Sequence, residues 1–438
     1  MPAFRLTTAL VALCAVIPAA ALAQAVHEVP VALETPNMPE EFRDASSDDP
    51  AFWVHPTDPA RTMVIVALKN AGMQVYDMTG ALVQDLEAAP EADGEAGRIN
   101  NVDVIYGMTM ADGSVIDVVV ASDRGQDMIR VFRIDGDSDA PLTEVTDLAA
   151  GRAFPTRPDM AGGADKDNPL GDQMTVYGIT GWMGADGAYV AVTQRTNPRI
   201  GIFRLVPTAD GTVGHELVHD VRVPWEFQGQ PLMVENDDDP LLDFSPQFEG
   251  LVADRVSGMI YAGQEDVGIW AIDGATGVIG DAPLYTTRGS PSSPFHAPDS
   301  VIARDVEGLT IYYGQSARYL LASSQGNAHG DQPTPDAPFD DTYTVFEIGA
   351  DGGLRVRGSI LAAASGDIDA VQGSDGADVI ATALPGFPEG LWVVHDEFDN
   401  DMLDGEVASS NFKFVSWGEI ARAFDPPLEI NPGFDPRQ

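Results

Sequence analysis

The sequence is short of the residues that cross-link exported proteins and of those that bind transition metals. It has one cysteine in 438 residues, Cys14, so the chain cannot form an internal disulfide bond. Its seven histidines show no metal-ligand spacing. No G-x-S-x-G, P-loop or H-E-x-x-H motif is present, so the sequence gives no support for a serine hydrolase, a P-loop nucleotide site or a zinc protease.

Basic residues are also scarce. The chain has 24 Lys and Arg against 68 Asp and Glu, a formal net charge of −44. Such a surface repels nucleic acid and anionic membranes, so we expect neither as a partner and expect a monomer. The carboxylate excess is typical of a halophilic surface, of a cation-binding protein, or of both.

Apolar runs long enough to span a membrane are absent too, and the stretch that comes nearest to one is N-terminal. Residues 6–17 follow Arg5 and precede an A-L-A pattern that ends at Ala23. This is typical of a signal peptide cleaved near Ala23 and too short for a membrane span, so we expect export to the periplasm or the medium. A lipoprotein anchored through Cys14 is a minor alternative, because Leu13 before it is not small.

A strand-like pattern recurs six times along the chain. Each copy has a β-rich apolar run, a polar residue, a turn and a second apolar run, as in MVIVALKNAGMQVYDM from Met63. The residues after the first runs stand 55 to 71 positions apart: Lys69, Arg124, Arg195, Glu265, Gln325 and Asp396. Such units bury their faces by stacking, so the repeat predicts an all-β fold, a six-bladed β-propeller, in one domain over 24–438. A β-sandwich is the alternative, and one short helix is expected over 417–424.

Equivalent positions in stacked blades meet near one end of a propeller axis, so the aligned residues should form a ring. Lys69, Arg124 and Arg195 make its basic sector. The opposite sector is acidic: Glu249, Glu265, Asp305, Glu307, Asp369, Asp375 and Asp396. Packed carboxylates repel unless a cation joins them, and oxygen ligands suit Ca²⁺ or Mg²⁺. Arginine and lysine suit an oxyanion, phosphate above all, so the ring predicts a phosphate that bridges protein bases and bound metal.

Three EGL triplets raise a simpler alternative. An acid and a glycine before a strand can be only a turn in which the carboxylate caps backbone N–H groups. For the triplet at Glu389, which has no second acid beside it, we prefer that structural interpretation.

Longer motifs extend from about Asp48 to about Trp417. They are DDPAFWVHP at 48–56, NNVDV at 100–104, VYG at 176–178, FEGLVAD, QEDVGIW, DVEGLTIYY, LLASSQGN and NFKFVSW. In these motifs the chain resembles the β-propeller phytases, calcium-dependent alkaline phytases of bacteria. The resemblance implies a six-bladed propeller, which agrees with the count of repeats.

The resemblance also implies roles for single residues. It implies calcium binding by Glu249, Glu265, Asp305, Glu307, Asp369 and Asp375, with Asp49, Asp48, Asp103 and Asp396 ranked below them. It implies catalysis by Lys69, Arg124, Tyr177 and Glu249, and substrate binding by Lys69, Arg124, Tyr177 and Arg195. The chain departs from the family at Asn70 and Arg195, where lysines are usual, and at Gly373, where an acid is usual.

The activity that the resemblance implies is the hydrolysis of phosphate monoesters of myo-inositol hexakisphosphate (phytate), a 3-phytase reaction on the calcium-bound substrate. Several calcium ions, catalytic and structural, are expected. Water activated by the metal would attack phosphorus in line, with no covalent phosphoenzyme. Two alternatives stay open: a calcium-dependent propeller lactonase or esterase, and a non-catalytic calcium-stabilised binding propeller.

Overall fold

The computed structural model of the chain describes residues 25–38, 47–92, 94–154, 170, 174–223, 226–227, 230–231, 247–289, 297–326, 337–399 and 409–438. The expected signal peptide lies outside these residues. Within them, no helix is long and apolar enough to cross a membrane.

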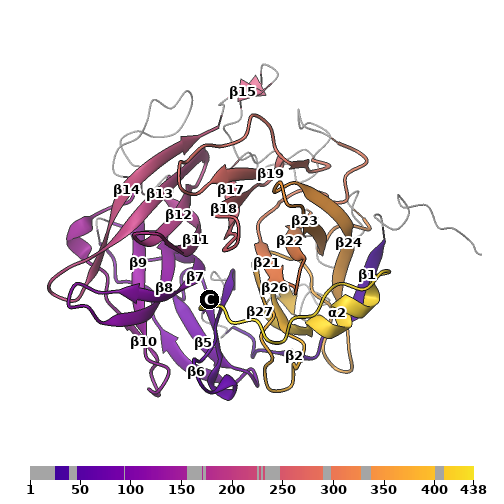
Figure 1. Ribbon diagram of the computed structural model, residues 1–438, viewed down its shortest axis with the longest axis horizontal. Helices are drawn as coiled ribbons and strands as arrows, with labels where there is room; N and C mark the ends of the chain where they lie inside the picture. The colour runs from indigo at the N-terminus through magenta and orange to yellow at the C-terminus, as the bar shows by residue number, and fades with distance from the viewer. Residues whose placement is uncertain are drawn as a thin grey trace, which may run out of the picture.

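Six β-sheets stand around a central axis, as Figure 1 shows. The innermost strands of the six sheets contact one another in a closed ring, in the order β3, β7, β11, β17, β21, β25 and back to β3. The prediction of a six-bladed β-propeller is therefore confirmed.

The first four blades are antiparallel sheets of four strands that are consecutive in sequence. Blade 1 holds β3 (Pro50–Trp53), β4 (Met63–Ala67), β5 (Met73–Asp77) and β6 (Leu82–Leu86). Blade 2 holds β7 (Ile99–Thr109), β8 (Val115–Asp123), β9 (Met128–Ile134) and β10 (Leu142–Glu144). Blade 3 holds β11 (Val176–Gly184), β12 (Gly187–Gln194), β13 (Asn197–Pro207) and β14 (Val213–Arg222). Blade 4 holds β17 (Phe248–Ala253), β18 (Met259–Gln264), β19 (Gly268–Asp273) and β20 (Tyr285–Thr286).

The last two blades combine both ends of the chain. Blade 5 holds β21 (Leu309–Tyr313), β22 (Arg318–Ser324), β23 (Thr342–Ile348) and β24 (Leu354–Ala363), to which β1 (Val26–Pro30) adds in parallel. Blade 6 holds β25 (Ala377–Ile380), β26 (Leu391–Asp399) and β27 (Ser409–Ser416), and β2 (Leu33–Glu34) adds antiparallel to β27. Two N-terminal segments thus cover edges that would otherwise be open, and they close the ring.

The remaining elements are short. A two-stranded sheet pairs β15 (Glu226–Phe227) with β16 (Gln230–Pro231), and two 3₁₀ turns are η2 (Pro59–Arg61) and η3 (Leu148–Ala150). The helix expected over 417–424 is present as α2 (Trp417–Ala423). Its Trp417 stacks on Tyr312 of blade 5 with 3.7 Å between the ring centroids, so α2 is packed against the propeller.

The hydrophobic core lies between blades. Six clusters of buried side chains each join two neighbouring sheets, from blades 1 and 2 round to blades 6 and 1. A blade is covered on both faces, so its inner strands read as unbroken apolar runs; all five residues of β4 are buried. This is why the repeats appear as runs such as MVIVA rather than as alternating patterns.

The repeat positions fall where the ring was predicted. Lys69, Arg124, Arg195, Glu265 and Gln325 follow the second strands of their blades, and Asp396 lies in β26. The antiparallel innermost strands begin at this same end of the axis. We call this end, where second strands finish and innermost strands start, the polar rim.

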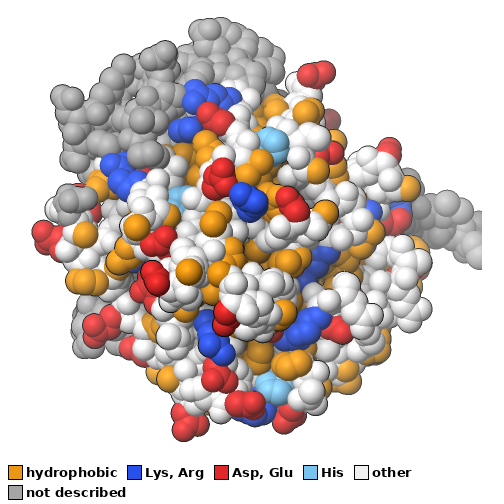
Figure 2. All heavy atoms as spheres, turned by 60° about the vertical axis from the view of Figure 1, so that its left-hand side comes forward, with side chains coloured by type: hydrophobic (Ala, Val, Ile, Leu, Met, Phe, Trp, Pro, Cys, Tyr) orange, Lys and Arg blue, Asp and Glu red, His pale blue; other side chains and the backbone are white. Residues whose placement is uncertain are grey.

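The outside of the molecule carries much of the acid excess. On the face in Figure 2, acidic side chains are scattered among apolar and uncharged ones rather than gathered in one patch. A concentrated group of carboxylates is found instead at the polar rim.

Candidate active site

An acid followed by glycine stands at the start of three innermost strands. The pairs are Glu249-Gly250, Glu307-Gly308 and Asp375-Gly376. A Cβ atom on Gly308 would lie 2.2 Å from the carbonyl oxygen of Asp375, and one on Gly376 would lie 2.5 Å from that of Asp48. Only glycine allows this close approach between blades. The pairs therefore bring the acids of successive blades side by side around the axis.

Five acids at the polar rim form two overlapping groups. One group is Asp48, Glu249 and Asp375, and the other is Glu249, Glu265 and Glu307. Within each group, one ligand oxygen from each residue lies within 4.8 Å of the others. We call these five residues the rim acids. Glu249 belongs to both groups, so it stands at the centre of the arrangement.

Four of the rim acids are buried and Glu307 is half-buried, and several of their oxygens accept no hydrogen bond from the described residues. Among the described residues, neither carboxylate oxygen of Asp48 accepts a hydrogen bond, and one oxygen each of Glu249, Glu307 and Asp375 also lacks a donor. Buried oxygens are normally paired, so these point to a missing positive partner. A set made only of carboxylate oxygens suits Ca²⁺ or Mg²⁺, and the residues present therefore fit a hard cation.

The electrostatics of the rim acids agree with that interpretation. Burial, with the nearby Asp48 carboxylate, raises the pKa of Glu249 to about 7. Burial and the neighbouring Glu249 and Glu265 carboxylates raise the pKa of Glu307 well above its ordinary value. The pKa of Asp375 is raised in the same way, first by burial and then by Glu307. A bound cation would remove this penalty by stabilising the ionised forms.

Lys69 faces the rim acids from blade 1. Its ammonium lies 3.8 Å from Asp48 Oδ1. Burial opposes its charge, but the carboxylates of Asp48, Glu397 and Asp375 outweigh burial and raise its pKa, so Lys69 is charged. Its backbone is in the left-handed region, with φ of 48°, which costs about 1–2 kcal/mol for a residue other than glycine. Backbone strain of this kind persists where the surrounding structure holds the residue in place, and such residues cluster at functional sites.

Tyr177 lies beside two guanidinium groups. Arg124 Cζ is 5.3 Å and Arg195 Cζ 5.6 Å from the centroid of its ring. Arg124 Nη1 donates to Asn100 Oδ1 at 2.7 Å, and Asn100 Nδ2 donates to Glu249 Oε1 at 2.6 Å. The basic and acidic sectors are thus linked through one amide. Lys69, Arg124, Tyr177, Arg195 and Glu249, all predicted from the sequence, are brought together.

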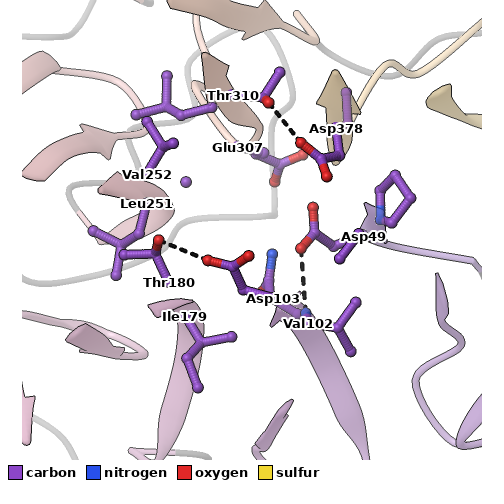
Figure 3. Close-up of a pocket in the computed structure, with 16 residues that line it drawn as sticks. Asp49, Val102, Asp103, Ile179, Thr180, Leu251, Val252, Glu307, Thr310 and Asp378 are labelled. Carbon is purple, nitrogen blue, oxygen red and sulfur yellow. Dashed lines mark hydrogen bonds between the residues drawn. The ribbon is translucent and has the colours of Figure 1, made fainter. Parts of the chain in front are cut away.

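Two predicted metal ligands, Asp305 and Asp49, are not members of the two groups of rim acids, although each lies near one of those acids. Asp305 precedes β21 with a left-handed backbone, φ of 53°, and belongs to neither group of three among the described residues. Asp49 lies deeper, where it lines a cavity of about 40 Å³ on the axis with Asp103 and Asp378 (Figure 3).

The acids of this deeper layer are hydrogen-bonded between blades. Asp49 accepts from the Val102 amide at 3.2 Å, Asp103 from the Thr180 hydroxyl at 2.9 Å, and Asp378 from the Thr310 hydroxyl at 2.8 Å. Each bond crosses from one blade to a neighbour, as Figure 3 shows. We infer that this layer ties the blades together below the rim acids.

Asp369 lies in a separate cluster in blade 6, centred on a buried lysine. The Lys413 ammonium is within 2.5 to 3.1 Å of four carboxylates: Glu34, Asp369, Asp396 and Asp399. We call these five residues the Lys413 cluster. Three of its acids, Glu34, Asp369 and Asp399, also lie close enough together to share a cation. Asp369 is therefore placed in a second acidic group, apart from Asp375.

The third EGL triplet has a different environment. Glu389 is half-buried and pairs with Arg422 of α2 at 2.8 Å. It precedes β26, a second strand, rather than an innermost one. This placement favours the structural interpretation preferred for it from the sequence.

Sequence reasoning assigned no function to three residues that the structure brings to these clusters. Asn100 links Arg124 to Glu249, Arg98 hydrogen-bonds Asn70, and Lys413 fills the blade 6 cluster. Asn100 lies in the motif NNVDV and Lys413 in NFKFVSW. The sequence therefore pointed to these segments, but not to the residues that Asn100 and Lys413 contact. Arg98, just before NNVDV, is a lone basic residue in an acidic chain, which was the available signal.

The chain is similar in sequence to proteins of known function. The chain is 29% identical over 418 residues to a 3-phytase of Bacillus subtilis (strain 168), an alignment that covers 94% of this chain and 90% of the relative. Among solved structures, it is similar to the β-propeller domain of Cps50 (Swd1) from Myceliophteria thermophila, with a TM-score of 0.39, 12% identity, and coverage of 88% of this chain and 99% of that one. The phytase family model matches residues 3–152 and 234–438. The chain therefore belongs to the phytase family.

Proposed function

We propose that the protein is a calcium-dependent phytase of the 3-phytase type, which hydrolyses phosphate monoesters of myo-inositol hexakisphosphate by direct attack of water. One observation carries the proposal. Buried carboxylate oxygens that accept no hydrogen bond from any described residue lie beside Lys69 and Arg124, in a member of the phytase family. An acidic chain can bind a polyanion only where bound cations and bases reverse the local charge.

The rim acids would hold the calcium: Asp48, Glu249, Glu265, Glu307 and Asp375. When bound, calcium would acidify a water molecule and stabilise the negative charge of the phosphoryl group during transfer. Asp49, Asp305 and Asp369 were also predicted as ligands, and we propose for them a part in further, structural calcium sites.

The protein's own groups would bind and orient the phosphate. The guanidinium groups of Arg124 and Arg195 can each donate two hydrogen bonds to it, and Lys69 adds a point charge. The Tyr177 ring lies beside both arginines, 5.3 Å from Arg124 Cζ and 5.6 Å from Arg195 Cζ, and Asn100 fixes Arg124 relative to Glu249. These groups would stabilise the charge that develops on the transferred phosphoryl oxygens.

Phosphate release from phytate by the purified protein tests this function. It would be measured at neutral to mildly alkaline pH with calcium, with a chelator, and with calcium restored. We expect release with calcium, loss with the chelator and recovery when calcium returns. A folded, calcium-loaded protein that releases no phosphate would refute the proposal.

We also propose that the protein is exported, on the basis of the pattern in residues 1–23. N-terminal sequencing of the protein secreted or released from the periplasm of its host should begin just after Ala23. A mature protein that retains residue 1 would contradict export by cleavage.

A further inference from the structure

Glu397 lies near the end of β26 and has no assigned part in the site. Earlier in this strand, Leu391 and Val393 belong to the core cluster that joins blade 6 to blade 1. Alternate residues of a strand share a face, so His395 and Glu397 continue that side. Their contact agrees, since His395 Nε2 lies 3.2 Å from Glu397 Oε2. The Glu397 carboxylate is therefore directed to the junction between blades 6 and 1, where Lys69 lies.

The backbone around Glu397 has two features that accommodate its side chain. Glu397 and Phe398 together stand opposite the single residue Ser410 in a β-bulge, which redirects a side chain out of the regular register. The Glu397 amide donates to the Gln372 carbonyl at 2.9 Å. A Cβ atom on the next residue, Gly373, would lie 2.8 Å from Glu397 Cβ. Only glycine at position 373 leaves room for Glu397 in this place.

The charge of Glu397 is stabilised by the chain itself, unlike that of the rim acids. Burial would raise the pKa of Glu397, but the contact with His395 and the charge of Lys69 outweigh burial and lower that pKa. The pKa values of Glu249 and Asp375 are raised instead. Among the described residues, Glu397 belongs to none of the acidic groups that could share a cation. Glu397 is thus an ionised partner that does not depend on bound metal.

Lys69 lies between this carboxylate and the rim acids. Its ammonium is 3.8 Å from Asp48 Oδ1. Burial opposes the charge of Lys69, and Asp48 and then Glu397 are the carboxylates that most raise its pKa against burial. A lysine side chain is flexible, so one ion pair does not fix where its ammonium points. When Asp48 binds a cation, its charge is shared with that cation, and Glu397 remains to balance Lys69.

We propose that Glu397 is a positioning residue, which holds the Lys69 ammonium from blade 6 while the rim acids hold the cation, and that His395 in turn fixes Glu397. The inference rests on the proposed function, in which Lys69 contacts the phosphate. A carboxylate near a phosphate weakens its binding by repulsion. An acid at this position therefore favours the reaction only through Lys69.

Steady-state kinetics of Glu397→Gln in the calcium-loaded full chain test the inference. With Lys69 no longer held, kcat/KM for inositol hexakisphosphate should fall about 10-fold, mostly through kcat, because a misplaced group stabilises the transition state poorly. Glu397→Asp keeps the charge but shortens the side chain, so its kcat/KM should lie between those of Glu397→Gln and the wild type. If Glu397 only repelled the substrate, Glu397→Gln would raise kcat/KM. A rise or no change overturns the inference.

A double-mutant cycle with Lys69→Met shows whether Glu397 acts through Lys69. In the Lys69→Met background, Glu397→Gln should cause no further fall in kcat/KM, because no ammonium is left to position. A fall of the same size in both backgrounds overturns the inference. The matched control is Glu216→Gln, which removes the same charge from an exposed pair with Arg204 on blade 3 and should leave kcat/KM at the wild-type value.

Calorimetry of inositol hexakisphosphate binding to the calcium-loaded protein separates this inference from the proposed function. If the wild type binds the compound but releases no phosphate, the phytase proposal fails, while weaker binding by Glu397→Gln only where Lys69 is present still supports the inference. If the wild type turns over and Glu397→Gln keeps the wild-type kcat/KM, the function stands and the inference is overturned. Should Glu397→Gln fold poorly, Glu397→Asp decides the matter, and a wild-type kcat/KM in that variant overturns the inference.

Discussion

The rim acids and the Lys413 cluster are two groups of closely packed carboxylates that differ in what balances their charge. The Lys413 cluster encloses an ammonium that contacts all four of its acids within 3.1 Å. The rim acids have Lys69 only at their edge, 3.8 Å from Asp48, and several of their buried oxygens accept no hydrogen bond from the described residues.

The difference indicates what each group is for. A cluster with a cation built into the chain is partly neutralised as soon as blade 6 folds. A cluster without one is costly until a cation arrives from solution, and so it depends on conditions outside the protein. We infer that the Lys413 cluster mainly supports the fold and that the rim acids mainly support the reaction.

Lys413→Met should give the largest effect, and the effect should be on stability. It leaves Glu34, Asp369, Asp396 and Asp399 without their shared ammonium, and the loss of one partner from a buried pair costs about 3–5 kcal/mol. Urea denaturation in the presence of calcium measures the free energy of unfolding. The control is Arg422→Met, which breaks exposed pairs with Glu389 and Glu419 and should scarcely move the midpoint. If Lys413→Met unfolds at the same urea concentration as the wild type, the Lys413 cluster does not stabilise the fold, and the proposed difference from the rim acids is wrong.

Glu307→Gln should reverse the pattern, with loss of activity and little loss of stability. The amide keeps the size of the side chain but removes one of the charges that would hold a cation. We expect kcat for phosphate release to fall by about 100-fold or more at saturating calcium. Urea denaturation without calcium should show a protein at least as stable as the wild type, because one buried repulsion is gone. A variant that keeps its kcat would show that Glu307 is not part of the reacting centre.

Tyr177→Phe should have a smaller effect, because it keeps the ring beside Arg124 and Arg195. It removes the hydroxyl whose hydrogen bond opposes the rise in the pKa of Glu249. We expect kcat/KM to fall about 10-fold, the usual range for one hydrogen bond to a charged group. Tyr177→Ala, which also removes the ring, should lower kcat/KM further than Tyr177→Phe. Equal kcat/KM values for the two variants would mean that the ring does not position the arginines.

The fold could be predicted from the sequence because each repeat has the same order of apolar run, polar residue and turn, so equivalent positions can be aligned between blades. The residues after the first apolar run of each repeat, such as Lys69 and Glu265, do follow the second strands of their blades. The closing strands could not be predicted. β1 and β2 are short, and LE at residues 33–34 has no pattern that indicates pairing with a strand almost 380 positions away.

Many residues of the site could be predicted from the sequence, but which of them lie together could not. Acids such as Glu249 and Glu307 were visible because they stand before glycines at strand starts. Whether Asp369 joins Asp375 or Lys413 depends on contacts between strands of blade 6, which the sequence does not order in space. Likewise, the sequence showed the uncharged Asn70, but only the folded ring shows that it hydrogen-bonds Arg98 of the next blade.

The closed ring of blades has a consequence for the order of folding. Asp48 belongs to the first blade and Asp375 to the last, and the backbone of Gly376 packs against Asp48 across the seam where the ring closes. The group of Asp48, Glu249 and Asp375 can exist only after residues more than 300 positions apart have met, a contact of very high order. An ion bound there would join carboxylates of the first and the last blade. Closure of the ring and assembly of the cation site would then be the same event.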